Sequence, residues 1–211
     1  MTDHAHDRGL VGVARYLGNL PQMWRSSVSD AVVALVRPLP GERVLDLGAG
    51  MGPATLTAAG SGAEVLAVDP TPFMRAVLRL RRLGSRHRGR IRVVDGAAES
   101  MPVAPGSIDA LWTVNTIHHW TDVERAVVEL KRVLRPGGRV VLVDEDFDDK
   151  AHPLHEPMKR RREGHGHHFA QVDPQAVAAL FERHGFRSVQ GGVEQVAGCP
   201  AKVVRAVRAE G

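Results

Sequence analysis

Short, mostly apolar runs alternate with helix-like stretches between residues 43 and 145. Runs of this kind, followed by helical patterns, are typical of parallel strands that are covered on both faces. Five strands are predicted, at Val44–Leu47, Val65–Val68, Ile91–Val94, Ile108–Val114 and Arg139–Val143.

Apolar residues at helical spacing fill the segments around these strands. The pattern is clearest at Val123–Leu134, where Asp122 can cap the start and Pro136-Gly137-Gly138 stops the helix. Further helices are predicted at Ser29–Val36, Pro53–Ala59 and Phe73–Leu83.

The pattern changes after residue 145. Residues 146–171 are polar and rich in histidine, and we expect them to form a lid. A helix, Pro174–Arg183, and two strands, Phe186–Val193 and Ala201–Val207, follow, with the strands joined by a turn at Gly198-Cys199-Pro200. The whole pattern predicts one α/β domain over residues 1–211, with a helical cover at 1–40. Its sheet is doubly wound, seven-stranded and mostly parallel, with an antiparallel last strand.

The chain has 211 residues, enough to bury a sizeable core without the help of disulfides or a structural metal. Its one cysteine, Cys199, excludes an internal disulfide and a Cys-based zinc site, and we expect it away from the functional site. No run of about 18 apolar residues exists, and Met1–Leu10 lacks the apolar stretch of a secretory signal. We therefore expect a cytoplasmic protein without a membrane partner. Its oligomeric state stays open, a dimer included.

The most informative stretch is Val44–Pro53, which is a predicted strand, a glycine-rich turn and a helix start. Gly48 and Gly50 let the backbone pass close to a ligand, because no Cβ stands in the way. Asp46 ends the strand and can accept a hydrogen bond from an ammonium group. Asp69 ends the next strand, where an acidic side chain can take both ribose hydroxyls of an adenosine.

Two cofactor classes share this layout. A dinucleotide site needs Gly-x-Gly-x-x-Gly or Ala, but the sixth residue from Gly48 is Pro53. The carboxylate of Asp46 would also repel a pyrophosphate, whereas it suits a cationic amino-acid tail. The motif therefore favours S-adenosylmethionine over NAD.

The sequence resembles the class I S-adenosylmethionine-dependent methyltransferases of the small type, related to quinone-biosynthesis and sugar methyltransferases. Four blocks match in order within residues 40–145, at Val44–Gly52, Ala67–Asp69, Gly96–Pro102, and Asp109–His119 with Leu134–Gly138. The resemblance implies a Rossmann-like sheet of strand order 3-2-1-4-5-7-6, with the cofactor across the carboxyl ends of the strands. It also implies cofactor-binding positions at Asp46, Gly48, Ala49, Gly50, Gly52, Asp69, Pro70, Ala97, Ala98 and Asn115. Many relatives have Asp where this chain has Ala97, so adenine is expected on backbone groups or on Asp95.

The segment after the fourth strand, Asn115–Trp120, lies where an acceptor would meet the methyl group. Methyltransferases of base or glutamine amino groups usually carry Asn or Asp, Pro-Pro and an aromatic residue here, and this chain does not. That chemistry is therefore disfavoured. We expect transfer to a small molecule at oxygen, with transfer to nitrogen or carbon left open. A neutral histidine suits removal of the acceptor's proton. Similarity to sugar and natural-product O-methyltransferases implies His118 as that base and Asp144 as its acidic partner.

The residues leave alternatives open around this pair. His119 is the second candidate base, and Glu145 and Asp146 lie beside Asp144 as other acidic partners. Structural histidines bonded to a loop carbonyl are the non-catalytic alternative for His118 and His119.

Two other clusters admit a functional interpretation. A metal site among the lid histidines is not expected, since no recognised ligand spacing is present; these are His152, His155, His165, His167 and His168. Arginines at helical spacing could grip RNA phosphates or form one solvated helix face; these are Arg75, Arg79, Arg82 and Arg86, followed by Arg88, Arg90 and Arg92.

Nucleic acid is the less favoured partner, because no aromatic residues interleave with these arginines. The formal net charge is +4, and 24 of the 28 basic residues are Arg, a bias that weakens any argument from charge. Two rivals to a small-molecule enzyme remain. One is an RNA or protein methyltransferase, and the other is a protein that binds S-adenosylmethionine without transferring its methyl group.

Overall fold

The computed structural model describes residues 26–165 and 172–210, with residues 161–165 described as backbone alone. Its helices are α3 (Ser27–Val36), α4 (Pro53–Ala59), α5 (Pro72–Leu83), α6 (Val123–Val133), α7 (His155–His165) and α8 (Pro174–Arg183). Its strands are β1 (Arg43–Leu47), β2 (Glu64–Val68), β3 (Ile91–Val94), β4 (Ile108–Val114), β5 (Leu134–Glu145), β6 (Phe186–Val196) and β7 (Cys199–Arg208). Two 3₁₀ turns complete the described part, η2 (Arg88–Arg90) and η3 (Ile117–His119).

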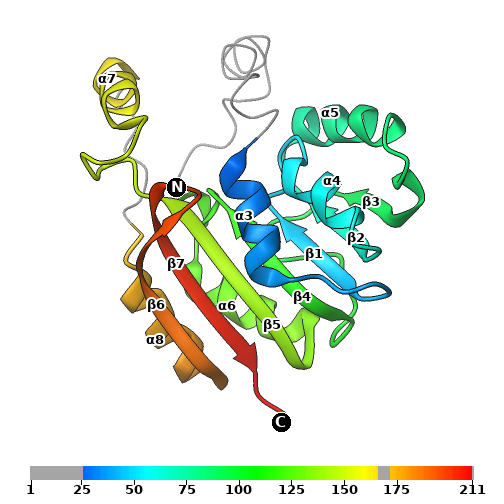
Figure 1. The fold of residues 1–211 in the computed structure, drawn as a ribbon. Helices are drawn as coiled ribbons and strands as arrows, with labels where there is room; N and C mark the ends of the chain where they lie inside the picture. Colours follow the sequence, from blue (N-terminus) through cyan, green and yellow to red (C-terminus); the bar gives the residue numbers. More distant parts are fainter. Residues whose placement is uncertain (1–25, 166–171, 211) are drawn as a thin grey trace.

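The strands form one seven-stranded sheet in the order β3-β2-β1-β4-β5-β7-β6 (Figure 1). Neighbours from β3 to β5 are parallel, and β7 runs antiparallel to both β5 and β6. The predicted strand order and the antiparallel last strand are confirmed. Because the strands from β3 to β5 are parallel, their carboxyl ends meet at one edge of the sheet, where open α/β sheets bind ligands.

Helices cover both faces of the sheet, which is why its strands are apolar on both sides (Figure 1). Helices α6 and α8 bury Leu130 and Phe181 against one face, which includes Leu45 of β1. Helices α3 and α4 bury side chains such as Val32 against the other face, which includes Val44. Successive residues of β1 thus face opposite layers, as the pleat of a strand requires.

The structure corrects the predicted elements most clearly at the last hairpin, at β5 and after residue 145. The turn between β6 and β7 is Ala197-Gly198, so Cys199 and Pro200 belong to β7 and not to the turn. Both turn residues have positive φ, 53° and 79°, as a two-residue hairpin turn that matches the strand twist requires. Strand β5 begins at Leu134, directly after α6. The polar segment after residue 145 also contains α7, which the sequence pattern did not predict.

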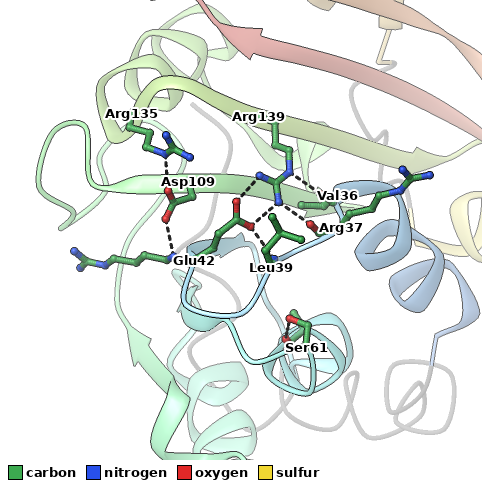
Figure 2. Close-up of polar contacts among 10 residues, drawn as sticks. Val36, Arg37, Leu39, Glu42, Ser61, Asp109, Arg135 and Arg139 are labelled. Atoms are coloured by element: carbon green, nitrogen blue, oxygen red, sulfur yellow. Dashed lines mark hydrogen bonds and ion pairs between the residues drawn. The ribbon is translucent and has the colours of Figure 1, made fainter.

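The opposite edge of the sheet is held by the guanidinium of Arg139 on β5 (Figure 2). Its Nε and Nη2 donate to the carbonyls of Val36 and Arg37 at the end of α3, at 2.6 and 2.7 Å. Its Nη1 and Nη2 donate to both carboxylate oxygens of Glu42, at 2.8 and 2.6 Å. The hydrogen bonds from Arg139 lower the pKa of Glu42. The Arg139 side chain thus links its own strand, β5, to the end of α3 and to the residue that precedes β1.

None of the described helices is long and apolar enough to cross a bilayer.

Candidate functional site

The glycine-rich turn between β1 and α4 has three glycines at positive φ, each with a different surrounding. A Cβ on Gly48 would lie 2.2 Å from Thr116, and one on Gly52 would lie 2.1 Å from Leu78. A Cβ on Gly50 would meet no atom within 4 Å. Packing therefore requires Gly48 and Gly52 to be glycines, while Gly50 borders open space at the carboxyl edge of the sheet.

Asp69 holds this turn in place from the end of β2. Its Oδ2 accepts the N–H of Gly50 at 2.8 Å, and its Oδ1 accepts the N–H of Thr71 at 2.8 Å. The side chain is buried, and burial raises the pKa of its carboxyl against the opposing effect of these two N–H groups. Each oxygen keeps a second lone pair, so the carboxylate can still accept hydrogen bonds from a ligand beside Gly50.

Asp46, which was expected to accept a hydrogen bond from the ammonium group of a cofactor, is almost completely buried. It is 2% exposed, and its Oδ2 accepts a hydrogen bond of 2.5 Å from the Thr55 hydroxyl on α4. Burial raises the pKa of Asp46 to about 7, with the nearby charge of Asp69 acting in the same direction. In this arrangement Asp46 joins β1 to α4 beneath the glycine turn. Thr55 is a partner that sequence reasoning missed, although it lies nine residues after Asp46 on the predicted helix.

The predicted adenine end of the site contains Asp95, Ala97 and Ala98. Asp95 has a side chain that is 71% exposed and pairs with Arg75 at 2.8 Å. The backbone N–H and carbonyl of Ala97 are both bonded to Ser100, and Ala98 is buried. Adenine was expected to bind either backbone groups or Asp95. The backbone of Ala97 is already hydrogen-bonded to Ser100, whereas Asp95 presents a carboxylate at the surface.

Arg75 corrects the expectation of one solvated arginine face. It is only 8% exposed, and its Nη1 donates to the carbonyl of Asp69 and to Oδ1 of Asp95. It lies in the first turn of α5, beside two strand ends that carry these acceptors. Other arginines of this region also bond backbone carbonyls, as Arg82 does with Ile91 on the edge strand β3.

Asn115 and Glu145 join the ends of β4 and β5. Asn115 has a φ of 55°, a left-handed conformation that asparagine tolerates better than most residues. Its Nδ2 donates to Oε2 of Glu145 at 2.6 Å, and its Oδ1 accepts the N–H of Glu145 at 2.7 Å. This reciprocal pair fixes the backbone just before the predicted catalytic segment.

The next residues place His118 against Asp144. The Nδ1 atom of His118 lies 2.8 Å from Oδ2 of Asp144, whose side chain is 4% exposed. The same carboxylate accepts the N–H of Thr116 at 2.9 Å and holds the 3₁₀ turn η3 at the end of β4. A carboxylate beside Nδ1 favours the neutral tautomer with the proton on Nδ1 and the lone pair on Nε2. His119 is exposed, and its ring stacks at a tilt against that of His118, with centroids 4.1 Å apart.

A second histidine–carboxylate pair lies beside the first. His152 is 3% exposed, and its Nε2 lies 3.1 Å from Oε1 of Glu145. Its Nδ1 accepts the N–H of Leu154, so a neutral ring carries its proton on Nε2 and donates it to Glu145. The pair anchors the start of the predicted lid to the end of β5, a role that the sequence pattern did not reveal.

Cys199 lies near this pair, contrary to the expectation that it is remote. One potential metal-ligand atom from each of Glu145, His152 and Cys199 lies within 4.8 Å of the other two, because the start of β7 runs beside the end of β5. Burial and the charge of Glu145 raise the pKa of the Cys199 thiol. The Nδ1 of His152 faces an N–H donor, so Nε2 has no lone pair for a metal in the neutral ring. His155 bonds the carbonyl of Phe147 through Nδ1, His165 is described as backbone, and His167 and His168 lie outside the described residues.

The residues at the glycine turn fit a cofactor with an adenosine and an aminoacyl tail. Gly50 leaves open space, the Asp69 carboxylate borders it, and Gly48, Ala49 and Gly52 shape the turn. Pro70 is exposed at the same edge. Asp69 at the end of β2 and the His118–Asp144 pair at the ends of β4 and β5 flank the glycine turn after β1 along the carboxyl edge of the sheet.

Residues 45–142 match the family model described as a methyltransferase domain. An uncharacterized methyltransferase of Mycobacterium tuberculosis is 39% identical over 60% of this chain and 49% of that protein. A ubiquinone/menaquinone biosynthesis C-methyltransferase of Methylobacterium nodulans is 37% identical over 60% of this chain and 50% of its own length. Among solved structures, phosphoethanolamine N-methyltransferase 2 of Haemonchus contortus with S-adenosyl-L-methionine has a TM-score of 0.66 at 18% identity. That match covers 86% of this chain and 52% of the other.

The chain spans about half the length of these two curated relatives. The matched region runs from β1 to β5 and so includes the glycine turn, Asp69 and the His118 segment.

Proposed function

We propose that the chain is a class I, S-adenosylmethionine-dependent methyltransferase that methylates a small molecule at a hydroxyl oxygen. The match of residues 45–142 to a methyltransferase domain and a relative that is 39% identical support this proposal. The observation that carries the proposal is the 2.8 Å contact between His118 Nδ1 and Asp144 at the carboxyl edge of the sheet. It supplies a base next to the place where the cofactor of this family binds.

The cofactor is S-adenosylmethionine, which supplies an electrophilic methyl group on its sulfonium when bound. The residues that would hold it are those of the glycine turn, with Asp69 accepting hydrogen bonds from the ribose hydroxyls. Asp46 supports this turn from below through Thr55. The enzyme's main contribution is to align the acceptor oxygen with the methyl group, as expected for catalysis by proximity.

His118 removes the proton of the acceptor. Asp144 accepts the hydrogen bond of Nδ1–H, so the other ring nitrogen, Nε2, takes the hydroxyl proton. Asp144 then stabilises the imidazolium that results. His119, which is exposed beside it, is the alternative base. Asn115 and Glu145 position this segment through their reciprocal hydrogen bonds.

Transfer to carbon is a second candidate, because relatives include a protein named as a quinone-biosynthesis C-methyltransferase. A hydroxylated ring that loses its hydroxyl proton becomes nucleophilic at ring carbon as well as at oxygen. Transfer to carbon also requires that the ring lose the proton of the carbon that receives the methyl group. The two reactions therefore share the proton transfer to His118 and differ in this second proton loss, and the products distinguish them.

The experiment is a panel assay for S-adenosylhomocysteine formation with sugars, phenols and quinols, followed by mass spectrometry and NMR of the product. We expect turnover with at least one hydroxylated small molecule and a new O-methyl or C-methyl resonance. Turnover with RNA or protein alone would overturn the small-molecule proposal. Tight cofactor binding without turnover on any acceptor class would favour a binding protein.

A further inference from the structure

Charge is distributed very unevenly along this chain. Residues 70–94, which contain α5, η2 and β3, hold eight arginines and no aspartate or glutamate. The other 186 residues hold 20 basic and 24 acidic residues, a formal net charge of −4 against +8 for the segment. The segment forms one end of the sheet, at its β3 edge (Figure 1). The β3 end of the sheet is therefore strongly cationic.

Helix α5 has a second apolar stripe that faces away from the core. Met74 and Leu78 are its buried residues and pack inward. The outward stripe follows i, i+4 and i+3 spacing and is exposed along its whole length; it consists of Pro72, Ala76, Leu80 and Leu83. Leu80 is 69% exposed and Leu83 is 62% exposed, the largest values among the exposed large hydrophobic residues of the described chain.

Exposed arginines border this stripe. They are Arg79 on the helix, and Arg86, Arg88, Arg90 and Arg92 in the turn and strand that follow. Among the described side chains, no ion pair joins any of these five to a carboxylate. An open groove of about 460 Å³ continues the apolar surface toward α4, lined by Leu56, Leu80, Arg81, Gly84 and Ser85.

We propose that this surface, the α5 face, docks on an anionic lipid bilayer. Exposed leucines flanked by arginines are what an interfacial helix presents, with the apolar side chains in the headgroup boundary and the cations on lipid phosphates. Nucleic acid would neutralise the arginines but would leave Leu80 and Leu83 without an apolar partner. The segment also has no tryptophan or tyrosine, and its two other aromatic rings, Phe73 and His87, are half-buried, so it offers no exposed ring on which bases could stack.

Docking would bring the site close to the membrane. Helix α5 begins at Pro72, three residues after Asp69, so its first turn lies at the carboxyl edge of the sheet. The expectation of no membrane partner rested on the absence of a spanning segment, and a surface-bound helix needs none. The proposal does not depend on methyl transfer, and its test contains no turnover.

The test is flotation of the purified full-length chain with vesicles at 0.1 M salt. We expect binding to vesicles of equal parts phosphatidylglycerol and phosphatidylcholine, and little to phosphatidylcholine alone. The variant Arg86→Gln/Arg88→Gln/Arg90→Gln should weaken binding about 100-fold, since each charge near an anionic surface contributes roughly fivefold. Leu80→Gln/Leu83→Gln should weaken it by about tenfold or more, through loss of apolar contact.

Two control variants remove exposed arginines or exposed apolar side chains that lie outside the α5 face. Arg125→Gln/Arg183→Gln/Arg187→Gln removes three exposed charges from α6, α8 and β6, and Leu39→Gln/Val193→Gln removes exposed apolar residues of 57% and 58% exposure. Both controls should bind like the parent chain. Equal binding to both vesicle types, or equal losses in the controls, would overturn the proposal. Retention of a short single-stranded RNA at the same salt with no vesicle binding would overturn it in favour of nucleic acid.

Discussion

His118 and Asp144 lie 26 residues apart in the chain, yet Nδ1 of the histidine is 2.8 Å from Oδ2 of the aspartate. The contact forms because β4 and β5 are parallel neighbours and both end at the same edge of the sheet. Asp144 also accepts backbone N–H groups of the turn that carries His118, so one carboxylate fixes both the ring and its backbone. A histidine held this way loses little entropy when it acts as a base.

Replacing the proposed base should separate chemistry from binding. His118→Ala is expected to lower turnover about 100-fold or more, the usual contribution of a general base, while cofactor affinity barely changes. His119→Ala is the control and should keep most of the activity. Steady-state kinetics and calorimetry measure the two effects. Wild-type turnover in a folded His118→Ala chain would remove this residue from the mechanism.

Asp69 should govern cofactor affinity. Asp69→Ala is expected to weaken S-adenosylmethionine binding by about 1.5–3 kcal/mol, the usual loss for a charge-assisted hydrogen bond. Asp95→Ala, which removes an exposed carboxylate paired with Arg75, tests the adenine end in the same calorimetric titration. NAD should show no comparable affinity. An unchanged constant in Asp69→Ala, or micromolar NAD binding, would contradict the assignment.

Asp46 should make the cofactor-free chain less stable as pH rises. Its pKa is about 7 in the folded chain against 3.8 for an ordinary aspartate, so its contribution is fully present below about pH 4 and is lost as pH rises through 7. The change is on the order of 4 kcal/mol. Asp46→Asn should remove this part of the pH dependence. Urea unfolding at pH 4 and pH 8 measures the difference, and parallel pH profiles for the two chains would refute it.

Arg139 should matter more for stability than a similar exposed pair. Arg139→Lys cannot reproduce the fork to Glu42 and two carbonyls, and we expect a loss of about 2–3 kcal/mol. Arg205→Lys, whose partner Glu194 is 43% exposed, should cost less than about 1 kcal/mol. Chemical denaturation of both variants decides the comparison.

The stability from Glu42 is present above its ordinary pKa of 4.5 and is lost as pH falls through its lowered folded pKa.

His152 should anchor the segment that leads into α7. His152→Ala removes the contact to Glu145 and the acceptor for the Leu154 N–H, so cleavage after residue 145 by limited proteolysis should become faster. Cofactor and acceptor together should slow that cleavage in the parent chain if the segment acts as a lid. Glu156→Gln, at an exposed side chain of the same segment, is the matched control and should be cleaved like the parent chain. Identical cleavage in all three chains, with and without ligands, would argue against both roles.

Much of the fold was predictable because the signals that define it are local. The strand Ile91–Val94 and the helix Pro174–Arg183 were predicted with the bounds that the structure has. Apolar runs, a proline in the first helical turn and a glycine beyond the last one act over a few residues, so one window of sequence contains the whole cause. The hairpin turn was misplaced because Ala197 takes a positive φ that a sequence pattern rarely assigns to alanine.

The sequence by itself determined the strand–turn–helix of the glycine motif, the acidic residues at the ends of β1 and β2, and the histidine after β4. Only the tertiary structure decided which carboxylate each histidine meets, Asp144 for His118 and Glu145 for His152. It also decided that Arg75 is buried and that Cys199 lies beside Glu145. These pairings depend on the register of strands far apart in the chain. A shift of one residue turns a side chain to the other face of the sheet, so no local pattern can specify them.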